Sequence, residues 1–276
     1  MRGKLLAITA LLCLVAAGAA DAADAAGPVT AGPNTYTGNF AVAGGSAGTV
    51  AKPKAVAMTE TLGMGSATAG NVGAPLVDIR TTTYGVMAPY AKYFPKCTAG
   101  QINGQGASTQ KWNGVCPAGS LVATGNVTAA LTSPTVNLLG PGAPCVLQLW
   151  VYNAGPGAET FFFTTSPSQC DGLTTGAAAA WTGKISQQGK YFVTDTPEPG
   201  DVSYNAGNVG LFGSLQSETL NFKRLTVKHA GKVYPYLESV GCANHARPFT
   251  IAYTATESNS GSPTVGTGTV KGTAAC

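Results

Sequence analysis

Cys145-Val-Leu-Gln-Leu-Trp-Val-Tyr152 is the stretch of this 276-residue chain that decides its fold. The run is apolar on both faces, so it predicts a central strand that is covered on both sides. Asn153-Ala-Gly-Pro-Gly157 follows as a turn, and Thr160–Thr165 then carries three consecutive phenylalanines. Two such runs joined by a short Gly/Pro segment are typical of a β-hairpin.

Alternation of apolar and polar residues recurs on both sides of this hairpin and predicts further strands. The clearest case is Phe249, Ile251 and Tyr253, which alternate with threonine and alanine. Residues 56–62, 121–127, 181–185 and 190–194 show the same pattern. About eight or more short strands with Gly/Pro turns, and no convincing long helix, indicate an all-β fold. We expect a single antiparallel β-sandwich that is jelly-roll-like.

The segment from Gly213 to Gly231 has the longest interior without Gly or Pro, so it is the best candidate for a helix. Its interior instead contains two alternating pairs, Leu220-x-Phe222 and Leu225-x-Val227, with a phase slip at Lys223-Arg224. A β-bulge produces such a slip. The pattern predicts one bulged strand over Leu220–Val227, with a helix as the alternative.

Residues 1–25 have the features of a signal peptide. Arg2 and Lys4 precede the apolar run Leu5–Ala17, and small residues then offer cleavage near Ala22 or Ala25. The apolar run is shorter than the roughly 20 residues that span a bilayer, which disfavours the alternative of an uncleaved anchor.

The remaining chain is expected to form one domain. Residues 26–50 are a lead-in rich in Gly, Ala and Thr, in which Tyr36, Phe40 and Val42 alternate well enough for a first strand. Residues 51–276 form the predicted sandwich. Cys13 does not suit a lipid anchor, because Leu12 before it is not small and both lie deep in the apolar run.

Six cysteines follow the predicted signal peptide, and an even number in an exported chain predicts disulfides. We expect pairs of sequence neighbours, each closing a turn-rich segment: Cys97 with Cys116, Cys145 with Cys170, and Cys242 with Cys276. Metal binding or thiol catalysis is the rival chemistry. No C-x-x-C pair occurs and no histidine has zinc-ligand spacing from a cysteine pair, so structural disulfides are favoured.

The composition excludes several classes of protein. Only 10% of the residues are charged while 44% are hydrophobic, which is not the composition of a disordered chain. The net charge is +4, and apart from Lys223, Arg224, Lys228 and Lys232 the cations are scattered. We therefore expect no nucleic-acid partner. We also expect no cofactor, and no membrane span after the signal peptide.

Asp195, Glu198 and Asp201 are the polar feature that we would mutate first, because they lie within seven residues. Loop carboxylates can bind calcium or catalyse glycoside hydrolysis. The spacing does not match an EF-hand, and the two prolines of this segment favour a stiff solvated turn instead. These three residues are weak candidate metal ligands, and no catalytic residue is assigned.

Three tryptophans offer a possible sugar-binding platform. Trp150 lies in the most apolar strand and is expected in the core. Trp112 has polar neighbours inside the Cys97–Cys116 loop, so it is the weak candidate for ligand binding. Trp181 begins a predicted strand, and packing is favoured over binding for all three.

Two other features match catalytic patterns. Gly44-Gly-Ser-Ala-Gly48 has the letters of a nucleophile elbow, but the strand and helix that flank such an elbow are missing. His229 and His245 are the only histidines, and no activated serine is indicated beside either. We interpret them as ordinary surface or loop residues.

Two stretches resemble a group of uncharacterised secreted β-sandwich proteins of soil actinobacteria. The first is Cys97 followed by Cys116-Pro-Ala-Gly-Ser120 and a glycine-containing strand. The second runs from Leu225 through a basic turn to Gly241-Cys242, and then to Arg247-Pro-Phe249. Ala243 stands where the group's pattern has proline. The resemblance implies the fold and export, and it implies no activity.

These observations predict a secreted or cell-envelope-associated, non-enzymatic module. Its role would be structural, or the binding of a surface ligand such as a glycan or cell-wall component. The alternative is a secreted polysaccharide-active hydrolase that uses carboxylates of the 195–201 segment.

Overall fold

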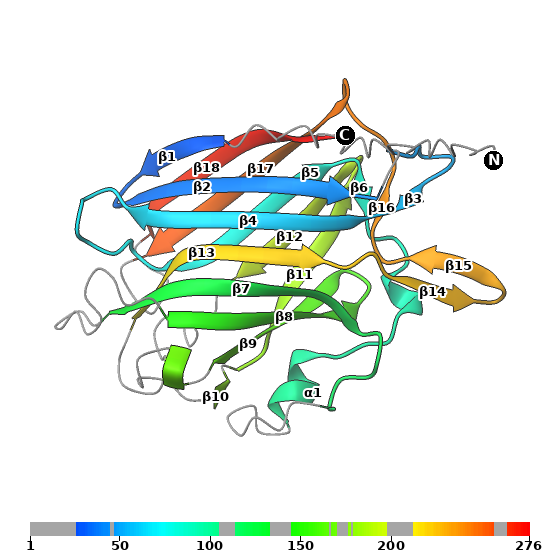
Figure 1. Cartoon of the computed structure of the whole chain (residues 1–276), viewed down its shortest axis with the longest axis horizontal. Coiled ribbons are helices and arrows are strands. Elements are labelled where there is room, and N and C mark those ends of the chain that lie inside the picture. Colours follow the sequence, from blue (N-terminus) through cyan, green and yellow to red (C-terminus); the bar gives the residue numbers. More distant parts are fainter. Residues whose placement is uncertain are drawn as a thin grey trace, which may run out of the picture.

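A computed structural model describes residues 26–44, 47–104, 114–132, 145–165, 167–169, 176–177, 179–197, 212–256 and 264–276. The described chain is almost entirely antiparallel β-strand (Figure 1). Its helices are short: α1 (Ala99–Asn103) and the 3-10 turns η1 (Ala91–Tyr93) and η3 (Pro167–Gln169). None of these described helices is long and apolar enough to cross a membrane.

One large sheet contains most of the strands. In chain order they are β1 (Ala26–Ala31), β2 (Asn34–Ala43), β4 (Ala57–Ser66), β5 (Leu76–Tyr84), β7 (Leu121–Thr132), β8 (Cys145–Gly155), β9 (Ala158–Thr165), β10 (Gly176–Ala177), β11 (Trp181–Gln188), β12 (Tyr191–Pro197), β13 (Phe212–Phe222), β17 (Ala246–Thr256) and β18 (Thr264–Ala275). Their spatial order is β1-β2-β4-β13-β7-β8-β9-β11-β12-β5-β17-β18, with β10 beside β9.

Two small sheets accompany it. One is the hairpin of β14 (Thr226–His229) and β15 (Lys232–Pro235). The other joins β3 (Lys54–Ala55), β16 (Glu238–Ser239) and β6 (Val86–Met87). In Figure 1 the β14–β15 hairpin projects from one end of the large sheet.

The large sheet rolls until its two ends face each other. Tyr36 of β2 stacks on Tyr253 of β17 with ring centroids 4.6 Å apart, and Phe40 contacts Phe249 at 5.1 Å. Gly268 of β18 leaves the space that the Tyr36 ring fills, since a Cβ there would collide with it. The roll therefore encloses one main core between its first and last strands.

The structure confirms the all-β, antiparallel fold. Strands β8 and β9 form the predicted hairpin, with Val151 opposite Phe161, and β8 lies inside the sheet between β7 and β9. The lead-in contains two strands, β1 and β2. The strands form one continuous rolled sheet, and the jelly-roll-like sandwich stays a prediction.

The prediction of strand for Leu220–Val227 is confirmed at both ends of the segment, but the prediction of one bulged strand is wrong. The helix does not form, and the chain does not continue as one bulged strand. Strand β13 ends at Phe222, and β14 begins at Thr226 in the separate hairpin. The phase slip is a turn: the Leu225 amide donates to the Lys223 carbonyl, so the chain leaves the large sheet there. The irregularity in β13 lies between Leu215 and Ser217.

Two predicted disulfides are present. Cys97 is bonded to Cys116 with Cα atoms 5.2 Å apart, and Cys242 to Cys276 with Cα atoms 6.2 Å apart. Cys145 is also disulfide-bonded, and Cys170, its predicted partner, lies outside the described residues.

Candidate ligand-binding surface

The β14–β15 hairpin is closed by a tight two-residue turn. Ala230 and Gly231 have φ angles of 48° and 78°, the left-handed values that a type I′ turn requires. His229 lies opposite Lys232, and Val227 opposite Tyr234. Because side chains alternate along a strand, these four point to one face of the hairpin, while Lys228 points to the other.

Four aromatic rings gather where this face meets the chain after β6. We call Tyr90, Tyr93, Tyr234 and His229 the tyrosine cluster. Tyr93 is its centre: its ring centroid lies 4.5 Å from His229, 4.6 Å from Tyr234 and 6.2 Å from Tyr90. Tyr90 also contacts Tyr234 at 4.9 Å. The three tyrosines are partly exposed, and His229 is exposed.

The segment that carries Tyr90 and Tyr93 is fixed to the large sheet by Asn153. The Asn153 side-chain amide donates to the carbonyls of Ala91 (3.0 Å), Phe94 (3.3 Å) and Pro95 (3.0 Å). The Cys97 amide donates to the Asn153 carbonyl at 2.9 Å. These bonds fix the backbone that carries Tyr90 and Tyr93, and a surface that is fixed in advance lowers the entropic cost of binding.

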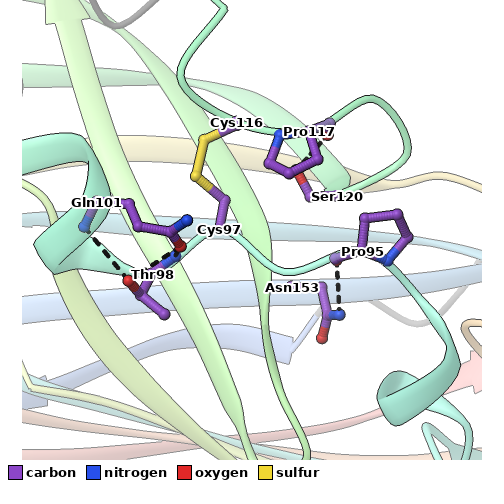
Figure 2. The surroundings of a disulfide bond; sticks show 8 residues. All are labelled: Pro95, Cys97, Thr98, Gln101, Cys116, Pro117, Ser120 and Asn153. Carbon is purple, nitrogen blue, oxygen red and sulfur yellow. Dashed lines mark hydrogen bonds between the residues drawn. A yellow bond between two sulfur atoms is a disulfide. The ribbon is translucent and has the colours of Figure 1, made fainter.

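Figure 2 shows how the Cys97–Cys116 disulfide extends this support. Beyond it, Thr98 caps helix α1 through reciprocal hydrogen bonds with Gln101. On the other side of the bridge, Ser120 donates to the Pro117 carbonyl at 2.7 Å. The chain that leads away from the cluster is therefore held at several points.

The side-chain polar atoms of the tyrosine cluster, in its three phenol groups and the imidazole, form no hydrogen bond to another described residue. Two buried tyrosines differ: Tyr236 donates to Glu159 at 2.9 Å, and Tyr253 donates to the Thr37 carbonyl at 2.7 Å. The cluster therefore combines ring surface with free donors and acceptors, a combination common at binding surfaces.

Two lysines lie beside the tyrosine cluster. Lys92 Nζ lies over the Tyr93 ring, 5.0 Å from its centroid, at cation–π distance. Lys232 lies directly opposite His229 on the same hairpin face. Glu238 is the acidic group that influences the cluster, and it is buried. Burial first, and then the charge of Glu238, raises the pKa of Tyr90.

The interior of the roll holds a second polar site. Glu60 of β4, Glu218 of β13 and Glu159 of β9 line one internal cavity, whose other walls are mostly apolar or threonine side chains. Glu60 lies opposite Leu220, and Glu218 lies opposite Leu62, so the two carboxyl groups are diagonal neighbours on one face.

Burial raises the pKa of all three glutamates. It raises the pKa of Glu159 to about 7, partly offset by the hydrogen bond from Tyr236, and that of Glu218 to about 7. Burial, followed by the charges of Glu218 and Glu159, raises the pKa of Glu60 well above its usual range. Glu159 Oε2 and the indole nitrogen of Trp181 have no hydrogen-bond partner within the described chain.

This cavity is too small for a sugar. Its volume is about 20 Å³. A cavity of roughly 10–15 Å³ holds a single water molecule, so this cavity has room for one or two. A carbohydrate therefore does not fit in this cavity.

Of the predicted carboxylates, Asp195 lies on β12 and Glu198 and Asp201 lie outside the described residues. Asp195 shares the outer face of the sheet with Asp78 of β5. Burial, and then the hydrogen bond and charge of Asp195, raise the pKa of Asp78 to about 6. Among the described side chains, no three His, Cys, Asp or Glu residues are placed so that they could hold one metal ion.

The tryptophans of the described chain pack rather than form a platform. Trp150 is partly buried on the outer face of β8, and its indole donates to Thr164 at 3.0 Å. Trp181 is 8% exposed and contacts Phe161 and Phe163 inside the roll. Trp112, the predicted ligand-binding residue, lies outside the described residues, as does Ser46 of the elbow-like motif.

Sequence reasoning missed the tyrosine cluster. The sequence predicts His229 as an ordinary surface residue, and it predicts no site at Tyr90, Tyr93 or Tyr234. A signal was present in the pair Tyr90 and Tyr93, which flank Lys92, but 141 residues separate Tyr93 from Tyr234. His245, by contrast, lies in a tight turn with a φ of 64°.

No protein-family model matches the chain, and no curated protein matches it either. The resemblance to secreted actinobacterial proteins therefore stays a prediction.

Proposed function

We propose that this protein is an exported, non-enzymatic, sandwich-like module that binds a carbohydrate of the cell surface through the tyrosine cluster. One observation carries the proposal. Four clustered rings, partly or fully exposed, keep their phenol and imidazole groups free of hydrogen bonds within the described chain.

The chemistry of such a surface suits a polyhydroxylated ligand. The C–H faces of a sugar ring pack on aromatic rings, while its hydroxyl groups need donors and acceptors at the ring edges. Tyrosine supplies both, and it loses little side-chain entropy because it has few rotatable bonds. The support from Asn153 keeps the rings in place before the ligand arrives.

Export is supported by the disulfides, since such bonds persist in oxidising compartments. The features of a signal peptide in residues 1–25 point the same way.

Replacing Tyr90 or Tyr234 with alanine tests the site. A glycan array and a cell-wall pull-down should show binding by the wild-type protein, with a loss of tenfold or more in each variant. A tenfold loss corresponds to about 1.4 kcal/mol, within the range of aromatic contacts. The matched control is Tyr191→Ala, because Tyr191 is 39% exposed and packs on Tyr84 of β5.

Binding that is equally strong in the cluster variants and in Tyr191→Ala would refute this assignment. Absence of binding by the wild-type protein to any glycan or wall fraction would refute the proposed function itself.

The hydrolase alternative receives no support from Asp195. Asp195 and Asp78 interact on the outer face of the sheet, where burial and then Asp195 raise the pKa of Asp78. The other two carboxylates of the proposed hydrolase segment, Glu198 and Asp201, lie outside the described residues.

A further inference from the structure

We propose that the ligand of the tyrosine cluster is an acidic polysaccharide, whose carboxylate or other anionic groups are bound by Lys92 and Lys232. This inference rests on the proposed function and narrows it from carbohydrates in general to one charge class.

The distribution of charge supports an anionic ligand. Every described lysine is exposed. Of the described glutamates, Glu60, Glu159 and Glu238 are buried, and Glu218 is half-buried. Glutamates inside the molecule do not pair with surface lysines, so cations outnumber anions on the described surface. A surface of one sign concentrates ligands of the other.

Two of the lysines lie at the rings. Lys92 is held against Tyr93, and Lys232 is directly across the hairpin from His229. Cross-strand neighbours have Cβ atoms about 4.5–5.5 Å apart, so an anion contacting His229 is within reach of Lys232. A ligand with one anionic group on each sugar would place charges near both lysines while its rings pack on the aromatic faces.

The free phenol groups favour a polysaccharide over a nucleic acid. Nucleic-acid binding draws most of its strength from many cations along a groove. At the cluster, Lys92 and Lys232 lie beside the rings, while Lys228 points to the opposite face of the hairpin. The three phenols instead offer hydrogen bonds to hydroxyl-rich ligands.

Polygalacturonate and its fully methyl-esterified form are suitable probes, because they share one backbone and differ in charge. Calorimetric titration of the purified, oxidised protein should show binding to polygalacturonate at least tenfold tighter than to the ester at low salt. The difference should shrink as salt is added, because salt screens exposed charges.

The hairpin provides a matched pair of variants. Lys232→Gln removes a charge on the cluster face, and Lys228→Gln removes one on the opposite face two residues from the same turn. Lys232→Gln should weaken binding to polygalacturonate at least fivefold, and a double variant with Lys92→Gln should weaken it further. Lys228→Gln should weaken it less than twofold. All of these lysines are exposed, so the fold should be retained, and circular dichroism checks it.

The outcomes test the anionic character of the ligand separately from the proposed function. Equal binding of the acid and the ester overturns the charge class and leaves the proposed function standing. Equal losses in Lys228→Gln and Lys232→Gln overturn the role of the cluster face. Binding of double-stranded DNA as tight as that of polygalacturonate, with the same dependence on Lys232, overturns the choice of a polysaccharide. No binding of either probe or of any other glycan overturns both claims.

Discussion

At the scale of single residues, Glu159 shows how the interior links stability to pH. It is fully buried, and burial raises its pKa from an ordinary value near 4.5 to about 7. A raised pKa means that the protonated form is favoured in the folded state. The stabilisation that the protonated Glu159 side chain gives the folded state is therefore complete below about pH 4.5. It is lost as the pH rises through about 7.

The variant Glu159→Gln should remove this dependence. Glutamine keeps an oxygen that accepts the Tyr236 hydrogen bond but carries no titrating proton. We expect its stability relative to the wild type to rise between pH 4.5 and 8, by on the order of 3 kcal/mol. Denaturant unfolding at several pH values measures the difference. Two results together would contradict the account of a buried carboxyl group. The wild type would become more stable over this pH range, and the difference in stability between the variant and the wild type would stay constant.

At the scale of elements, the β14–β15 hairpin carries a strained residue. Ala230 has a φ of 48°, a left-handed value that costs a residue with a Cβ roughly 1–2 kcal/mol. Asparagine tolerates this conformation, and Asn-Gly is the preferred pair in type I′ turns.

Ala230→Asn should therefore stabilise the hairpin by about 0.5–1 kcal/mol, whereas the β-branched Ala230→Val should destabilise it. Hydrogen exchange of the hairpin amides measures this directly, because a projecting hairpin can open without global unfolding. Faster exchange in Ala230→Asn than in the wild type would show that the turn is not strained as described.

The elements also show what sequence alone can predict. Alternation and the run at 145–152 were sufficient for the all-β fold and for the β8–β9 hairpin, because both signals are local. The path after Phe222 was not predictable, since a phase slip marks either a bulge or a turn into another sheet. The tyrosine cluster was hidden for a related reason: Tyr234 and His229 meet Tyr93 only through tertiary packing.

At the scale of the whole molecule, the Cys242–Cys276 disulfide joins the two ends of the last hairpin, β17–β18. It joins the end of β18 to the chain just before β17, and β18 lies where the Tyr36 ring of β2 packs. The bridge closes a loop with a sequence separation of 34 residues. In the chain-entropy model such a loop stabilises the fold by about 3–4 kcal/mol.

Replacing both Cys242 and Cys276 with serine should therefore lower the free energy of unfolding by about 3–4 kcal/mol. Guanidinium unfolding of the oxidised proteins measures it. Binding to the glycan at low temperature should persist, because the support of the tyrosine cluster uses the other bridge, Cys97–Cys116. An unchanged stability would show that the bridge does not stabilise the fold.

The central claim is that the tyrosine cluster is the binding site, and nuclear magnetic resonance of the protein with a short galacturonate oligomer tests it most directly. The ring and imidazole signals of Tyr90, Tyr93, Tyr234 and His229 should shift together and saturably as the oligomer is added. The signals of the Tyr84–Tyr191 pair should stay unchanged, because those rings pack on each other elsewhere on the sheet. Saturable shifts confined to residues outside the cluster would contradict the account.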